Sequence, residues 1–81
     1  MNIAVIGTGY VGLVTGVCLA AKGHDVTCLD VRQDVVDLQT AGKPHIYEEG
    51  LEDLLGEVRA AARFRAELAT PDALRGSALV L

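Results

Sequence analysis

The chain has 81 residues, too few for more than one domain, and a domain of this size buries only about 60% of the surface that its unfolded chain exposes. Hydrophobic residues make up 51% and charged residues 22% of the chain, which is typical of a globular protein rather than a disordered one. The formal net charge is −4 and Lys and Arg form no basic stripe, so nucleic acid is not an expected partner.

The first predicted element is a strand over residues 3–6, an apolar run rich in β-branched residues. Such a run is typical of a strand that is covered on both faces of a parallel sheet. It has no cationic flank and Gly7 interrupts it at once, so it predicts neither a signal peptide nor a membrane span. We therefore expect a cytoplasmic protein with no membrane partner.

A helix, a strand and a second helix follow in the pattern. Over residues 11–22 apolar positions repeat at helical spacing, and Gly23 predicts the end of that helix. The positions of this predicted helical face are Val11, Val14, Thr15, Cys18, Leu19 and Ala21. Residues 25–30 predict a second strand, and the apolar residues between 35 and 38 predict a second helix that ends before Gly42 and Pro44. An alternation of strand and helix indicates a parallel sheet.

The second half of the chain repeats this alternation. Residues 43–50 read as a loop, and the leucines that follow place one apolar face on a helix over 51–58. Residues 63–68 alternate polar and apolar side chains and predict a third strand, after which Thr70 and Pro71 predict a capped helix start. Residues 78–81 predict a fourth strand, and because no covering helix follows it, we expect a truncated sheet.

A glycine motif joins the first strand to the first helix. Its six residues are Gly7, Thr8, Gly9, Tyr10, Val11 and Gly12. A GxGxxG in this position is the fingerprint of a dinucleotide-binding turn. Gly7 permits the tight turn, Gly9 lets the backbone approach a pyrophosphate, and Gly12 lets helix and strand pack closely. The pyrophosphate would lie at the helix N-terminus, and no Gly-Lys-Ser/Thr follows that would indicate phosphoryl transfer.

Asp30 ends the second strand eighteen residues after Gly12, where an acidic residue is expected to bind the adenosine ribose. Its charge would repel a 2′-phosphate, so the sequence favours NAD over NADP, although Arg32 leaves an opening for the phosphorylated cofactor. Two structural alternatives stay open: Asp30 could be a helix cap, and the glycine turn could bind nothing. With strand order 3-2-1-4, the prediction is the first half of a Rossmann-type, doubly wound α/β fold.

The cysteines and histidines are expected to have structural rather than functional roles. Cys18 and Cys28 lie inside apolar patterns without CxxC spacing or neighbouring histidines, so we expect buried small hydrophobic residues, with no metal and no disulfide. His24 and His45 fall in turns without a partner at catalytic spacing, and we expect both to be solvated.

Over residues 2–20 the chain closely resembles the start of UDP-glucose 6-dehydrogenases, and the similarity continues through residues 23–30 and 46–51. GDP-mannose and UDP-N-acetylmannosamine dehydrogenases share the fingerprint, but residues 14–18 look most like the UDP-glucose branch. The resemblance implies an NAD-dependent enzyme that oxidises UDP-glucose twice to UDP-glucuronate through a cysteine thioester, and a homodimer in the full-length relative. It gives the cofactor role to Gly7, Gly9, Tyr10, Val11, Gly12 and Asp30.

The resemblance gives no catalytic residue to this chain. The family's nucleophilic cysteine and its lysine and asparagine partners lie in motifs far downstream, so neither cysteine here inherits the catalytic role. Residues 1–81 are therefore expected to be a partial NAD-binding domain that is inactive alone, with the substrate and catalytic domains absent. The alternative from another class is a regulatory nucleotide-sensing Rossmann module.

Three positions depart from the family pattern. Val35 stands where a lysine usually helps to hold the adenosine side of NAD, which predicts weaker cofactor binding. His45 and Glu49 each stand where proline is common, which predicts a looser loop.

Overall fold

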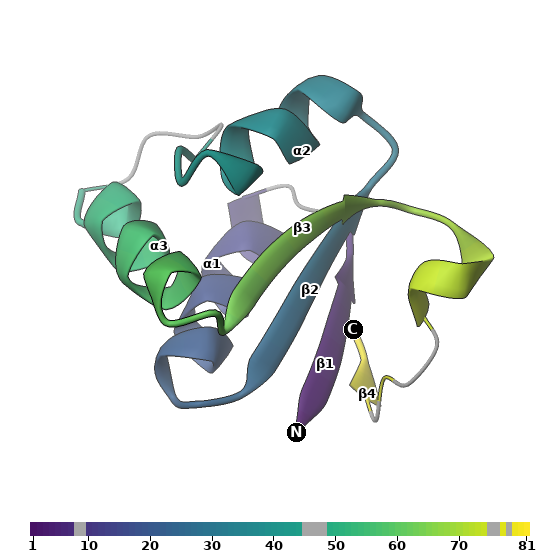
Figure 1. Ribbon diagram of the computed structural model, residues 1–81, viewed down its shortest axis with the longest axis horizontal. Coiled ribbons are helices and arrows are strands. Elements are labelled where there is room, and N and C mark those ends of the chain that lie inside the picture. The colour runs from purple at the N-terminus through teal and green to yellow at the C-terminus, as the bar shows by residue number, and fades with distance from the viewer. Residues whose placement is uncertain (8–9, 45–48, 75–76, 78) are drawn as a thin grey trace.

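The computed structural model describes residues 1–7, 10–44, 49–74, 77 and 79–81 (Figure 1). Each strand and each longer helix lies within about two residues of the place predicted from the hydrophobic pattern. The elements in chain order are β1 (Asn2–Ile6), α1 (Tyr10–Ala21), β2 (Asp25–Asp30), α2 (Gln33–Thr40), α3 (Leu51–Ala60), β3 (Phe64–Leu68), the 3₁₀ turn η1 (Pro71–Leu74) and β4 (Leu79–Val80).

The strands form one parallel sheet in the order β3-β2-β1-β4, which confirms the predicted topology. β1 lies inside the sheet, where Ile3 is paired with Val26 of β2 and with Leu79 of β4. Figure 1 shows α1 and α3 on one side of the sheet and η1 on the other. Right-handed crossovers produce this arrangement, and the Rossmann-type fold class is therefore confirmed.

The core lies between the sheet and the two helices α1 and α3. On α1, Leu13, Val17 and Ala20 lie on the side that contacts the strands, and all three are buried. The predicted apolar face of this helix is wrong in part, because Val11 and Cys18 are exposed. The other members of this cluster are Ile3, Val5, Val26, Cys28, Leu51, Leu55, Val58 and Phe64. Small aliphatic side chains thus fill nearly the whole core, as the composition indicated.

Helix α1 approaches the sheet closely at Gly16. A Cβ added to Gly16 would lie 2.8 Å from the Cys28 Sγ and 3.4 Å from the Val26 Cγ1, both on β2. The helix ends at a turn in which the Gly23 N–H donates to the Ala20 carbonyl at 3.0 Å, with Gly23 at φ 100°. Because this φ favours glycine, the predicted stop of the helix is confirmed.

The two cysteines differ in environment, and the prediction that both are buried is wrong for Cys18. Cys28 is 1% exposed, whereas Cys18 on α1 is exposed, and both thiols are free. Cys18 follows the buried Val17, and one residue rotates the helix by about 100°, which turns the Cys18 side chain away from the sheet. Burial raises the pKa of the Cys28 thiol to about 12.

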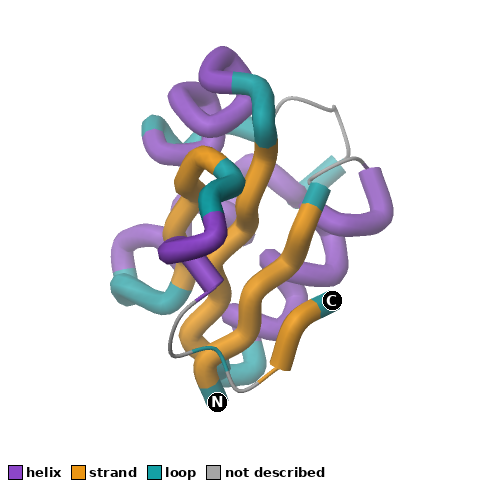
Figure 2. Tube along the Cα trace, turned by 90° about the vertical axis from the view of Figure 1, so that its right-hand side faces the viewer, coloured by secondary structure: helices purple, strands orange, loops and turns teal. Residues whose placement is uncertain are grey.

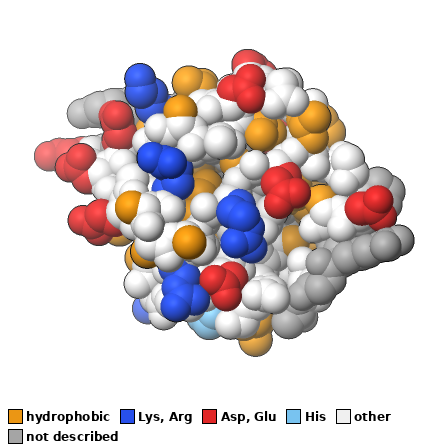
Figure 3. Space-filling model, viewed as in Figure 1, with side chains coloured by type: hydrophobic (Ala, Val, Ile, Leu, Met, Phe, Trp, Pro, Cys, Tyr) orange, Lys and Arg blue, Asp and Glu red, His pale blue; other side chains and the backbone are white. Residues whose placement is uncertain are grey.

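Charged groups lie on the surface around this core. Arg63, just before β3, forms an ion pair with Asp25 at the start of β2 at 3.1 Å. Figure 3 shows basic and acidic side chains interspersed with hydrophobic ones on the face that Figure 1 presents. In the part of the chain that the structure describes, no helix has both the length and the apolar character needed to cross a bilayer.

Candidate functional site

The turn that leaves β1 begins with glycine geometry. Gly7 has φ 78°, a left-handed conformation that favours glycine, and its N–H donates to the Leu29 carbonyl of β2 at 2.8 Å. This hydrogen bond extends the β1–β2 pairing by one residue, so the turn starts directly beside the end of β2. Gly7 therefore makes the tight turn that the sequence assigned to it.

Gly12 allows α1 to pass close to this turn. A Cβ on Gly12 would overlap the carbonyl oxygen of Gly7 and lie 3.6 Å from the Val5 Cγ1. No ordinary side chain fits there unless the backbone moves, because Cβ atoms do not approach a carbonyl oxygen so closely. The packing role predicted for Gly12 agrees with this geometry.

The rest of the motif is described in part. Thr8 and Gly9 lie outside the described residues, so the predicted approach of Gly9 to a pyrophosphate is not tested. Tyr10 is the first residue of α1, and Val11 in its first turn is 73% exposed. The N-terminus of α1 thus starts at the carboxyl end of β1, where unpaired N–H groups and the helix dipole favour an anion.

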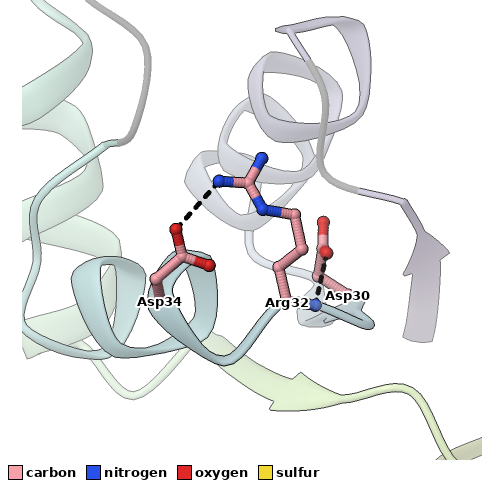
Figure 4. Close-up of polar contacts among 3 residues, drawn as sticks. All are labelled: Asp30, Arg32 and Asp34. Atoms are coloured by element: carbon pink, nitrogen blue, oxygen red, sulfur yellow. Dashed lines mark hydrogen bonds and ion pairs between the residues drawn. The ribbon is translucent and has the colours of Figure 1, made fainter.

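Asp30 is the last residue of β2, and its side chain takes part in a local turn (Figure 4). The Asp30 Oδ1 accepts a hydrogen bond from the Arg32 backbone N–H at 2.9 Å. The N-cap residue of α2 is Arg32, and its side chain makes no capping hydrogen bond. Asp30 is therefore not the helix cap that was the structural alternative, although its carboxylate shapes the turn that leads into α2.

The glycine turn and Asp30 lie at the same edge of the sheet. Ile6 of β1 is paired with Leu29 of β2, and Gly7 and Asp30 are the residues that directly follow these two. Figure 2 shows the two central strands running together to this end. In open parallel sheets, ligands bind outside the carboxyl ends of the strands, so this edge is the candidate site.

An ion pair completes the described part of this edge. The Arg32 Nη2 donates to the Asp34 Oδ2 at 2.8 Å, and the two side chains are 64% and 66% exposed. This hydrogen bond lowers the pKa of the Asp34 carboxyl and raises the pKa of the Arg32 guanidinium. Arg32 was a candidate from the sequence but Asp34 was not, because spacing does not show which acid an exposed arginine contacts.

The departures from the family pattern have different outcomes. Val35 is 2% exposed, so it is part of the interior beneath α2 and offers no charge to a ligand. Glu49 is exposed, and His45, together with the predicted Ile46, Tyr47 and Glu48 segment, lies outside the described residues. The predicted effects of these departures on cofactor binding and on the loop are not tested by the structure.

Other candidate residues lie away from this edge. His24 precedes β2, at the amino end of the strands, and its Nδ1 lies 3.4 Å from the amino group of Met1. The described residues contain no group of three or more His, Cys, Asp or Glu side chains that could hold a metal ion. Within that part of the chain the candidate site offers a ligand backbone groups, the carboxylates of Asp30 and Asp34, and the Arg32 guanidinium.

Comparison with known proteins places this geometry in a family. The model of the UDP-glucose/GDP-mannose dehydrogenase family, NAD binding domain, matches residues 1–81. A UDP-glucose 6-dehydrogenase of Bacillus subtilis is 51% identical over 67 residues, which are 83% of this chain and 15% of that protein. A GDP-mannose 6-dehydrogenase of Pseudomonas syringae pv. tomato is 40% identical over 79 residues, or 98% of this chain and 18% of that protein.

A solved structure supports the same assignment. The UDP-glucose dehydrogenase of the archaeon Pyrobaculum islandicum superposes with a TM-score of 0.91 at 37% identity, over 98% of this chain and 18% of that one. The chain thus spans less than a fifth of the length of these relatives. A family match along the whole chain, together with the Rossmann turn and the acid at the end of β2, shows that it belongs to the UDP-glucose/GDP-mannose dehydrogenase family and corresponds to the NAD-binding domain.

Proposed function

We propose that residues 1–81 form part of the NAD-binding half of an enzyme that oxidises UDP-glucose to UDP-glucuronate with two NAD molecules. The observation that supports this most strongly is the close approach of Gly12 to the Gly7 carbonyl, beside an acid at the end of β2. A turn packed this tightly leaves backbone N–H groups at a helix start open to a pyrophosphate.

Each fingerprint residue has a proposed part in holding NAD. Gly7, Gly9 and Gly12 keep the turn free of side chains, and Tyr10 and Val11 present the first N–H groups of α1 to the pyrophosphate. Asp30 accepts hydrogen bonds from the adenosine ribose hydroxyls through its carboxylate. NAD supplies the hydride acceptor when bound, and this chain's own residues bind and orient its adenosine diphosphate portion.

UDP-glucose is the proposed sugar nucleotide, and GDP-mannose is the alternative within the family. The proposal rests on the run of residues 14–18, because the identities to relatives of the two branches overlap: over 79 residues, a UDP-glucose 6-dehydrogenase is 41% identical and a GDP-mannose 6-dehydrogenase 40%. A nucleotide-sensing regulatory module was the candidate from another class. The family match along the whole chain favours the dehydrogenase.

Chimeric enzymes that carry residues 1–81 test both the cofactor role of the chain and its assignment to the UDP-glucose branch of the family. Residues 1–81 replace the matching segment in the B. subtilis UDP-glucose enzyme and, separately, in the P. syringae GDP-mannose enzyme. We expect the UDP-glucose graft to keep kcat/KM within roughly tenfold of its parent, a loss of about 1.4 kcal/mol in transition-state stabilisation. We expect the GDP-mannose graft to lose more.

The control for this graft is its Asp30→Ala variant, which should raise KM for NAD. A larger fraction of activity retained by the GDP-mannose graft would contradict the UDP-glucose assignment. Loss of NAD-dependent activity in both correctly folded grafts would contradict the cofactor role itself.

We also propose that this chain has no activity alone, because NAD binding supplies neither a nucleophile nor a general base. The check is an assay of NADH formation with UDP-glucose, NAD and the purified chain. Turnover above the rate of a buffer blank would overturn this proposal.

A further inference from the structure

Arg32 brings a positive charge to the place where an adenosine ribose is proposed to bind. Figure 4 shows its stem and the Asp30 side chain rising side by side from the turn after β2, before the guanidinium bends toward Asp34. The hydrogen bond and charge of Asp34, and to a smaller extent the charge of Asp30, raise the pKa of Arg32. A guanidinium in this position could reach either the ribose or a phosphate attached to it.

Such an arginine normally favours the phosphorylated cofactor. A 2′-phosphate carries close to two negative charges and three acceptor oxygens, and the planar guanidinium binds it through two parallel hydrogen bonds. NADP-binding Rossmann domains use an arginine near this turn for that purpose. If Arg32 were unengaged, the edge would offer both a carboxylate for NAD and a guanidinium for NADP.

Asp34 changes that balance through its ion pair. Its Oδ2 lies 2.8 Å from the Arg32 Nη2, so one of the donors needed for a two-bond phosphate clamp is occupied. The three side chains of Asp30, Arg32 and Asp34 carry a formal net charge of −1. A 2′-phosphate would therefore have to displace one carboxylate from Arg32 while lying close to another.

We propose that Asp34 is a specificity-determining residue, which favours NAD over NADP by holding the Arg32 guanidinium. This inference rests on the proposed function, because it concerns the selectivity of the proposed NAD site. Asp30 repels the 2′-phosphate directly, and Asp34 withdraws the cation that would attract it. Discrimination between the two nucleotides is thus shared by two carboxylates on either side of Arg32.

The test is calorimetric titration of the 81-residue chain with NAD and with NADP, in the wild type and in Asp34→Asn. We expect the ratio of the NADP to the NAD association constant to rise in Asp34→Asn by roughly threefold to tenfold, the range for an exposed arginine released to bind phosphate. The double variant Arg32→Gln with Asp34→Asn should return the ratio to the wild-type value. Arg32→Gln keeps the backbone N–H that donates a hydrogen bond to the Asp30 carboxylate.

Asp37→Asn is the matched control. Asp37 is an exposed acid on the same helix, and it accepts a hydrogen bond from Gln33 at 2.7 Å instead of contacting Arg32. Asp37→Asn removes the same charge as Asp34→Asn, so its ratio of the NADP to the NAD association constant should equal that of the wild type. An Asp34→Asn ratio no higher than the Asp37→Asn ratio would overturn the inference, as would a gain that persists in the double variant.

The wild-type titration separates this inference from the proposal beneath it. Absence of NAD binding by a chain whose circular dichroism shows it to be folded would overturn the proposed function and the inference with it. NAD binding with an unchanged selectivity in Asp34→Asn would overturn the inference alone.

Discussion

Cys18 and Cys28 show that the position of a residue on its helix or strand determines whether its side chain is buried. Both stand in apolar stretches of the sequence, yet one faces solvent from α1 and the other lies inside β2. The hydrophobic pattern located the helix, but it did not determine which side chains on the helix face the sheet. That choice depends on the packing of α1 against β2, which involves residues far apart in the sequence.

The exposure difference predicts different reactivities for the two thiols. In the native chain we expect an aromatic disulfide reagent to modify Cys18 rapidly and Cys28 only when the chain unfolds, because the thiolate is the reacting form and burial disfavours it. Counting released chromophore should give one fast equivalent, and a second in denaturant. Two fast equivalents under native conditions would contradict the burial of Cys28.

Burial of Cys28 also predicts a dependence of stability on pH. Its pKa rises from an ordinary value of 9.0 to about 12 in the folded chain, so between these values the unfolded chain binds fewer protons. The free energy of unfolding should therefore fall as the pH rises above 9, by up to about 1.4 kcal/mol per pH unit, until the folded thiol ionises as well. Below pH 9 the thiol is protonated in both states and contributes no slope.

The measurement is urea unfolding of the wild type and of Cys28→Ala from pH 8 to 10.5, and the slopes rather than the absolute stabilities are compared. Cys28→Ala should show a shallower decline of the free energy of unfolding than the wild type. Identical slopes in the wild type and Cys28→Ala would show that Cys28 ionises equally in both states.

At the scale of elements, the contact of α1 with β2 depends on Gly16. The hydrophobic pattern predicted the helix, the strand and their parallel order, because a period of 3.6 or of 2 is visible in the residues themselves. It did not single out Gly16, since the reason for a glycine there is the Cys28 Sγ on another element. The ion pair of Arg32 with Asp34 was not predicted from the sequence for a similar reason, because it depends on the bend between β2 and α2.

Gly16→Ala is therefore expected to destabilise the chain by roughly 1–3 kcal/mol, because the added methyl group overpacks the interface between α1 and β2. Gly56→Ala on α3 is the matched control, since an added Cβ there meets no atom within 4 Å. It should stabilise the chain by about 0.5–1 kcal/mol through helix propensity. Chemical denaturation measures both changes, and equal effects of the two substitutions would contradict the close contact at Gly16.

At the scale of the whole molecule, the parallel order β3-β2-β1-β4 brings two short segments together. The Gly7 turn and Asp30 are more than twenty residues apart in the chain, yet the β1–β2 register makes them neighbours at one edge. This juxtaposition could be predicted from the sequence, because the fingerprint and the following acid have a fixed relation in a βαβ unit. Family membership alone does not specify the sugar nucleotide, since relatives named for different substrates match the same residues.

The most direct test of the central claim, that this edge binds NAD, is calorimetric titration of the folded chain with NAD in the wild type, Asp30→Asn and Asp37→Asn. Asparagine keeps an Oδ1 to accept the Arg32 N–H, so the turn is preserved while the charged acceptor is lost. We expect saturable binding by the wild type and Asp37→Asn, weakened roughly tenfold or more in Asp30→Asn through the loss of a charge-assisted hydrogen bond. Equal NAD affinity in all three proteins would contradict the assignment of the ribose to Asp30, and no binding by any of them would contradict the site.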